Sequence, residues 1–472
     1  MIAGFAESLT IALLLGVLAA GWRRWPAAAQ RRLLAGSLAV GLGLGISSGL
    51  FIMWSSATGS PASYPVAEFV FVAVLAGFAF AARGRGSPKA GPTLVGDSGP
   101  YGVVLRIALG LCAVGAAIAF VAEASANPHG GWDAWMTWNM HARAIVRGAE
   151  GWREMLGALP DWSHPDYPLL IPASVARVWT YQGRESAGGA AAVGFLFTFA
   201  TVGLLYAAVS ALRSPTQGAL AALMLVTTKF FVLQGASQYA DIPLSFFFLA
   251  TLALLTLAEA WPTCRPRLLL LAGLTAGLAA WTKNEGLLFI PVVIAVYFLT
   301  RMDRPDVARD ARAAVIGLAP VVILVVAFKF WIAAPNDLLA DQGLAQIAAR
   351  VLEVDRYRQI LGGFVRAVLE VSAQGVVPVL LAGYVLAAGV APGAAERRAA
   401  RMAAMVVGLM LVGYAAVLLV APAPRLGTNI RSINRLLLQL WPSMLLAYFC
   451  LVRTVEEARL SAGRNRTSPE PA

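Results

Sequence analysis

Apolar runs of about 20 residues recur along the whole chain, and each is long enough to cross the ~30 Å hydrocarbon core of a bilayer as an α-helix. Spanning segments must be helices or closed barrels, because lipid offers no partner to an unpaired backbone amide. The runs are continuous in Leu, Ala, Val and Gly rather than alternating with polar residues, which favours helices. Only 13% of the 472 residues are charged, against about 25% in soluble domains. The sequence therefore predicts an all-α fold, a polytopic bundle of transmembrane helices.

About 13 spans are predicted from the lengths of these runs. They are expected at 2–21, 34–54, 64–82, 102–124, 188–212, 218–235, 242–260, 268–282, 286–300, 313–334, 374–391, 402–421 and 436–453. Arg and Lys concentrate in alternate short loops, as expected of cytoplasmic loops. This bias predicts that the N-terminus lies outside. High Ala, Gly and Arg with little Lys is typical of a GC-rich bacterial gene, so we expect a multi-pass protein of the bacterial inner (plasma) membrane.

The net charge of +12 would suggest nucleic acid as a partner in a soluble protein. Here the basic residues lie in short loops, so they more plainly set topology, and no nucleic-acid partner is predicted. The three cysteines lie in or beside apolar runs, and the sequence contains no CxxC, HExxH, Walker or GxGxxG motif. We therefore predict no cofactor and no metal ligands.

The chain divides into three parts on this interpretation. Residues 1–100 are predicted to be an N-terminal extension of three spans that ends in a Gly- and Pro-rich linker, 101–458 a transmembrane catalytic core, and 459–472 a polar cytoplasmic tail. Two extracytoplasmic loops interrupt the core, at about 125–187 and 335–373. The first contains amphipathic stretches at about 133–148 and 167–181, and the second has a helical pattern around 343–371.

The first loop opens with the segment GWDAWMTWNMHARAIVRG. Its three Trp residues recur every three positions, which puts them on one side of a helix, where indoles suit the membrane interface. Asp133 stands among them, and a carboxylate at the mouth of a membrane cavity can take a proton from an acceptor hydroxyl. The alternative is that Asp133 is only a helix N-cap.

Two further segments place acids near the same predicted surface. WSHPDYPLLIP carries His164, Asp166 and Tyr167 on an extended segment that leads into an apolar helix. QYADIPLSFFF carries Asp241 at the outer start of a span, two residues before a proline. The alternatives are a loop with a helix start and a helix cap, although an acid at the edge of a span is costly unless it is used or paired.

The remaining segments supply cations. WTKNEGLLFIP lies between two apolar runs of about 13 residues, or ~20 Å each, so its tip with Lys283 and Glu285 is expected below the outer surface. A lysine there suits a phosphate, and the alternative is a polar turn closed by a Lys–Glu pair. PRLGTNIRSINRLLLQLWP puts Arg431 and Arg435 on one helix face, where they suit phosphate oxygens or lipid headgroups.

Taken in order, GWDAW, HPDYPLLIP, YADIP, TKNEG and RSINR resemble the GT-C superfamily of membrane glycosyltransferases. The likeness is to the bacterial branch related to the protein O-mannosyltransferase and aminoarabinose transferase families, and it covers about residues 102–453. Many relatives have an Asp-Glu pair where this chain has Asp133-Ala134, and three predicted spans precede the family's first span.

This resemblance implies a sugar donor on a polyprenyl phosphate, and transfer with inversion to an extracytoplasmic acceptor hydroxyl on an envelope glycan, lipid or protein. It assigns Asp133 as the general base, and Lys283, Arg431 and Arg435 to the leaving lipid phosphate. His164, Asp166, Tyr167, Asp241 and Glu285 are expected to line the substrate site, with membrane lipids as further partners. The alternative functions are a transporter or flippase of a lipid-linked or small polar solute, or a scaffold in an envelope complex.

Overall fold

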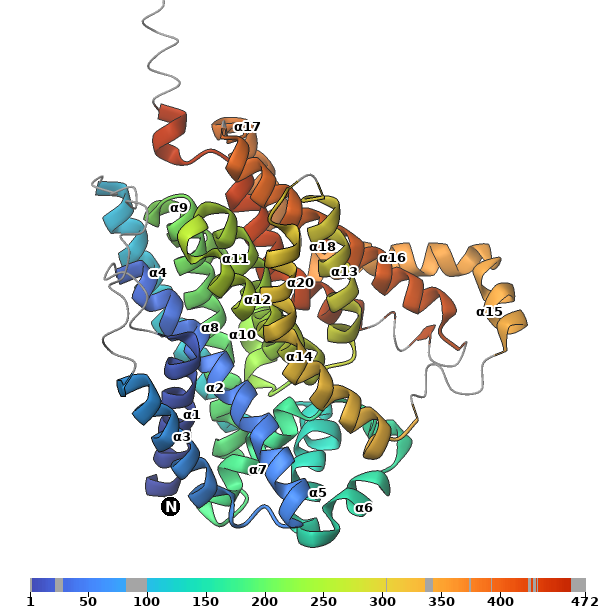
Figure 1. Cartoon of the computed structure of the whole chain (residues 1–472). Coiled ribbons are helices and arrows are strands. Elements are labelled where there is room, and N and C mark those ends of the chain that lie inside the picture. Colours follow the sequence, from blue (N-terminus) through green and yellow to red (C-terminus); the bar gives the residue numbers. More distant parts are fainter. Residues whose placement is uncertain are drawn as a thin grey trace, which may run out of the picture.

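The computed structural model describes residues 2–21, 29–81, 100–302, 304–335, 343–372, 375–391, 393–422, 426–427, 430 and 432–459. Throughout these residues the chain is helical, and its sole extended pairing there is an isolated bridge between Val390 and Val452. The predicted all-α bundle is confirmed (Figure 1).

The helices follow one another closely along the chain. Those of the first half are α1 (Ile2–Ala20), α2 (Ala29–Thr58), α3 (Tyr64–Ala81), α4 (Pro100–Ala126), α5 (Asn139–Gly148), α6 (Trp152–Gly157), α7 (Leu170–Gln182), α8 (Ala187–Leu212), α9 (Pro215–Val226) and α10 (Lys229–Ala236). Those of the second half are α11 (Asp241–Ala260), α12 (Arg265–Thr282), α13 (Glu285–Leu299), α14 (Val307–Trp331), α15 (Leu344–Val351), α16 (Val354–Val371), α17 (Val376–Ala388), α18 (Ala394–Val420) and α20 (Ile433–Leu451).

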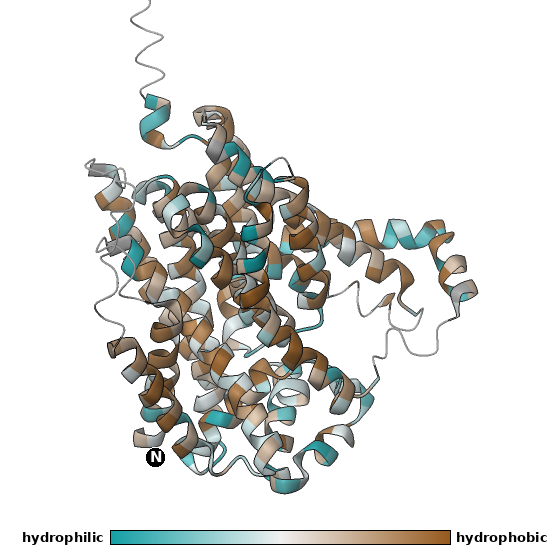
Figure 2. Ribbon diagram, viewed as in Figure 1, coloured by the Kyte–Doolittle hydropathy of each residue, from teal (hydrophilic) through white to brown (hydrophobic). Residues whose placement is uncertain are grey.

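Every predicted span coincides with one of these helices or, at 218–235, with the bent pair α9–α10. Eight helices of the described chain are long and apolar enough to cross a membrane, and two bent pairs, α9–α10 and α16–α17, meet the same test together. Hydrophobic residues dominate the bundle, whereas hydrophilic residues concentrate toward its two ends (Figure 2). The number of 13 spans itself stays a prediction.

The predicted loop 125–187 folds as a compact cap. Helices α5, α6 and α7 gather at one end of the bundle, at the bottom of Figure 1. The second predicted loop folds as α15 and α16, which project from the side of the bundle. Both loops therefore contain the helices that their amphipathic patterns predict.

The first three helices pack directly on elements that lead to the cap and to the TKNEG tip. The Arg177 Nη2 of α7 lies 2.7 Å from the Glu68 Oε2 of α3, and both side chains are almost fully buried. The same guanidinium donates to the carbonyl of Ser8 at 2.8 Å. On α12, the Trp281 indole donates to the Ser48 hydroxyl of α2 at 3.1 Å. The domain boundary near residue 100 stays a prediction.

Helices α12 and α14 approach each other so closely that their contact requires glycine. A Cβ on Gly273 of α12 would overlap the carbonyl oxygen of Ala314, and a Cβ on Gly317 of α14 would overlap that of Leu270. Small residues allow two membrane helices to bring their backbones into van der Waals contact. This packing fixes the ends of α12 and α14, which carry Lys283 and Lys329.

We expect Gly273→Val to lower the thermal stability of the purified protein markedly, because the α12–α14 backbones would have to separate. The matched control is Gly110→Val on α4, where a Cβ meets no atom within 4 Å. The measurement is the melting temperature of both variants in detergent. Equal melting temperatures would contradict this account of the α12–α14 contact.

Candidate functional site

A carboxylate buried among the helices forms the centre of the site. Asp241 is the first residue of α11, and its side chain is fully buried. Its Oδ1 accepts from Lys283 Nζ at 3.0 Å and from Gln439 Nε2 at 2.6 Å. Its Oδ2 accepts from Arg435 Nε at 2.8 Å. Asp241 therefore holds side chains from the α12–α13 tip and from α20 together.

Arg435 joins this buried acid to a second, more accessible one. Its Nη2 lies 2.7 Å from the Asp133 Oδ2 and 2.8 Å from the Asp241 Oδ2. The Asp133 side chain is 30% exposed, whereas that of Asp241 is 0% exposed. The guanidinium also lies over the ring of Tyr239, 4.7 Å from its centroid. One arginine thus bridges a partly exposed acid and a fully buried one.

The side chains of the TKNEG tip contact two different acids, Asp241 and Asp166. Lys283 has extended φ and ψ, which ends α12, and its Nζ lies 2.8 Å from the Glu285 Oε1. Between them, the Asn284 amide donates to the Asp166 Oδ2 at 2.7 Å. The Lys329 ammonium of α14 donates to the Asn284 Oδ1 at 2.8 Å and to the Asp166 carbonyl. The tip therefore links Asp241 to Asp166.

The HPDYP segment packs beside this tip through its rings. Tyr167 stacks on His164 with ring centroids 4.8 Å apart, and on Trp138 at 5.4 Å. The Lys283 Nζ lies 5.9 Å from the centroid of the Tyr167 ring. His164 ends a short 3-10 helix in the left-handed conformation, at φ +54°. This turn places Asp166 and Tyr167 against Asn284 and Lys283.

A π-helix follows Asp133, and it changes the predicted arrangement of the tryptophans. Residues Ala134–Trp138 form this wider turn, which often occurs at functional sites. Trp132 and Trp135 stay exposed, with ring centroids 5.1 Å apart, but Trp138 is buried. The expectation that all three lie on one side of a helix is therefore wrong, because the wider turn rotates Trp138 into the core.

Gln238 ties the turn before Asp133 to the turn before Asp241. It adopts φ +61°, which a non-glycine residue takes at an energetic cost, and such strain clusters at functional sites. Its side-chain amide donates to the Pro128 carbonyl at 3.1 Å and accepts from the Asn139 amide at 3.0 Å. Gln238 thus fixes the distance between the two acids that Arg435 bridges.

The cap interpretations of the acids are not supported. Asp133 occupies the N-cap position of its π-helix but makes no side-chain cap bond. Asp241 lies inside α11, whose N-cap residue is Ala240. The Lys–Glu turn does form, but Lys283 also reaches Asp241. Each carboxylate has its main contact with a side chain from another helix.

The site therefore contains most of the residues singled out in the sequence. Asp133, Asp166, Asp241, Lys283, Glu285 and Arg435 lie in two linked clusters, with His164 and Tyr167 stacked beside them. Arg431 lies outside the described residues. Sequence reasoning did not find Tyr239, Asn284, Lys329 and Gln439 as site residues. For two of these four the sequence contains a signal: Lys329 is a lysine within an apolar run, and Gln439 is four residues after Arg435.

Within the described residues, the two cations that contact Asp241 are each paired with carboxylates. Lys283 contacts Asp241 and Glu285, and Arg435 contacts Asp133 and Asp241. An anionic ligand that binds Lys283 or Arg435 must therefore displace a carboxylate from that cation. Asp133 and Asp241 both compete with such a ligand for Arg435, and Asp133 is the more exposed of the two. If Arg435 turns away, Asp241 still has Lys283 and Gln439 as hydrogen-bond donors.

His141 supports the cap that carries Asp133. It is fully buried on α5, and its Nε2 lies 3.0 Å from the Ser163 carbonyl oxygen. Burial disfavours the charged ring and lowers the pKa of His141 to about 4. A neutral, buried histidine of this kind connects α5 to the HPDYP segment and is not placed to exchange protons with a ligand.

This pKa predicts how the cap responds to acid. Below pH ~6.5 an unfolded chain binds a proton on His141 that the folded protein does not, so stability falls between pH ~6.5 and about 4. Above pH ~6.5 the residue contributes no pH dependence. We expect His141→Gln to flatten the fall in melting temperature over this range, relative to wild type. The control is His129→Gln at an exposed position; parallel curves for all three proteins would refute the assignment.

The protein is thus a bundle of membrane-spanning helices with an ion cluster where the bundle meets its helical cap. Residues 167–331 match the family model described as dolichyl-phosphate-mannose-protein mannosyltransferase. The chain is thus a membrane glycosyltransferase of the GT-C type, and the resemblance predicted from its sequence is confirmed. The match spans α7 to α14 and includes Tyr167, Asp241, Lys283 and Glu285. No curated protein and no solved structure gives a significant match.

Proposed function

We propose that this glycosyltransferase moves a sugar from a polyprenyl-phosphate donor to an acceptor hydroxyl on the extracytoplasmic side, with inversion and with Asp133 as general base. The observation that carries the proposal is the position of Arg435, whose guanidinium contacts both Asp133 and Asp241. A proton acceptor and a cation suited to phosphate meet there at one point. The family description, which names a lipid-phosphate sugar donor, supports this donor class.

The proposed step is a single displacement. The acceptor oxygen attacks the anomeric carbon from the face opposite the phosphate, and the bond between that carbon and the phosphate oxygen breaks. The bonding electrons go to the phosphate, and the acceptor's proton goes to the Asp133 carboxylate. Arg435 and Lys283 stabilise the charge that develops on the leaving phosphate. The products are the glycosylated acceptor and the polyprenyl phosphate.

Donor binding would also release the base. In the unliganded site Asp133 is paired with Arg435 at 2.7 Å, and a carboxylate in an ion pair is a poorer proton acceptor. A phosphate that takes Arg435 competes with Asp133 and leaves its carboxylate open to the acceptor hydroxyl. Asp241 keeps Lys283 in position during this exchange. The base would thus become available only when a donor is present.

We expect Asp133→Asn to abolish transfer while leaving the melting temperature nearly unchanged, because the side chain is partly exposed and the amide fills the same volume. The assay offers purified, reconstituted protein a panel of radiolabelled polyprenyl-phosphate sugars and a crude envelope acceptor. The matched control is Asp161→Asn, an exposed acid on the same cap. Normal turnover by Asp133→Asn would rule out the base. No transfer by folded wild type from any donor would favour the transporter interpretation.

A second variant tests the phosphate role of Arg435. We expect Arg435→Lys to raise the apparent KM for the donor by at least about tenfold, because an ammonium cannot contact two acids and a phosphate with the same fork of donors. The control is Arg358→Lys, an exposed arginine on α16. An unchanged KM for the donor, with folding retained, would exclude Arg435 from donor binding.

A further inference from the structure

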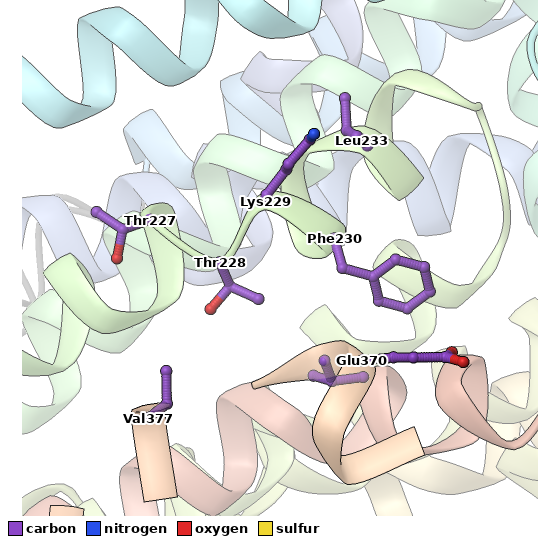
Figure 3. A pocket seen from close by; sticks show the side chains of 8 residues that line it. Thr227, Thr228, Lys229, Phe230, Leu233, Glu370 and Val377 are labelled. Atoms are coloured by element: carbon purple, nitrogen blue, oxygen red, sulfur yellow. The ribbon is translucent and has the colours of Figure 1, made fainter. Parts of the chain in front are cut away.

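The described part of the chain has a cavity outside the ion cluster, at the bend between α9 and α10. Together these two helices are long and apolar enough to cross a membrane, but their axes meet at an angle of 62°. The cavity has a volume of about 380 Å³. Figure 3 shows Thr228 and Phe230 on the side of the cavity that faces Glu370 and Val377, from α16 and α17, whereas the side chains of Lys229 and Leu233, which also line the cavity, extend away from that facing wall. Its size is that of a site for a small molecule or for one part of a larger ligand.

Lys229 is the unusual residue of this cavity. It lies within the bent span and is exposed, and the described residues provide no acid within ion-pair distance of it. The one acid on the facing wall, Glu370, instead accepts from the Asn434 amide at 2.8 Å. A lysine at membrane depth costs about 2.5–3.5 kcal/mol on insertion scales, so its charge calls for an anionic partner.

The other lining residues indicate which kind of group would lie beside the anionic group of a ligand. Half of the eight lining residues are apolar, namely Phe230, Leu233, Val371 and Val377. The hydroxyl groups of Thr227 and Thr228 are already engaged with carbonyls of their own helix. A ligand that fits has an anionic group for Lys229 and an apolar chain for the apolar part of the lining. That combination is a lipid phosphate.

The cavity's walls are attached to the helix that carries Arg435. Glu370 is bonded to Asn434, the residue before Arg435, and the Thr228 hydroxyl accepts from the Trp441 indole of the same helix at 3.2 Å. A lipid in the cavity would therefore lie against α20, whose outer turn reaches Asp133 and Asp241. This continuity favours a lipid that the ion cluster also uses over an unrelated bilayer lipid.

We propose that the cavity between α10, α16 and α17 is a second lipid-phosphate site, in which Lys229 binds the phosphate of a polyprenyl phosphate and the apolar wall holds its first isoprene units. The site would hold the carrier beside the ion cluster, before or after transfer. The identity of the lipid rests on the proposed function; the lipid-phosphate chemistry of the site does not.

Photo-crosslinking tests this proposal without an activity assay. A benzophenone amino acid replaces Val377, and a second protein carries it at Val379, an exposed α17 position outside the cavity lining. Each protein, in detergent, is illuminated with radiolabelled polyprenyl phosphate. We expect labelling at position 377 to exceed that at 379 at least about fivefold, to fall to the level of 379 with Lys229→Gln, and to persist with Lys229→Arg.

Competition identifies the occupant. Unlabelled polyprenyl phosphate should suppress labelling at 377, whereas polyprenol and phosphatidylglycerol at equal concentration should not. Labelling that ignores Lys229→Gln, or that polyprenol suppresses equally, would overturn the phosphate assignment. Suppression by phosphatidylglycerol would overturn the carrier assignment and make the occupant an ordinary membrane lipid. Labelling should be the same in the Asp133→Asn variant, so failure of this site and failure of the transfer mechanism are distinguishable.

Discussion

The buried carboxylate of Asp241 is the interaction on which the site depends. An ionised acid inside a helical bundle is tolerated only when cations and hydrogen-bond donors surround it, and removing one member of such a group typically costs about 3–5 kcal/mol. Lys283, Arg435 and Gln439 come from two different parts of the chain and converge on Asp241. The acid thus fixes how the α12–α13 tip and α20 meet, and Arg435 extends this arrangement to Asp133.

Interrupted helices make this convergence possible. The α12–α13 pair breaks at Lys283, which lets consecutive side chains serve Asp241 and Asp166 in turn. The π-helix after Asp133 turns Trp138 into the core, where it stacks on Tyr167. The α9–α10 bend exposes Lys229 to a cavity. Non-helical backbone at membrane depth is tolerated where protein or a water-filled cavity surrounds it, so such breaks commonly accompany function.

The bundle was readable from the sequence because apolar run length is a local property. Each predicted span matches a helix or a bent pair, and Asp133, Asp241, Lys283 and Arg435 stand out because charge is costly near spans. Their pairing was not readable: Asp241 and Arg435 are 194 positions apart, and only the folded chain brings them together. Gln238 and Asn284 were missed for a different reason, because an amide side chain carries no charge that would mark it in the sequence. The π-helix was missed because its residues fit an ordinary helical pattern.

The central claim is that a lipid phosphate and Asp133 compete for Arg435. The most direct test is the affinity of the purified protein for polyprenyl phosphate, with and without Asp133→Asn. Both proteins also carry Lys229→Gln, which removes lipid-phosphate binding at the cavity beside α20. The account predicts that Asp133→Asn, although inactive in transfer, binds the lipid phosphate several-fold more tightly, because Arg435 no longer has to leave a carboxylate. Equal or weaker binding by Asp133→Asn would contradict the exchange and return the Asp133–Arg435 pair to a purely structural role.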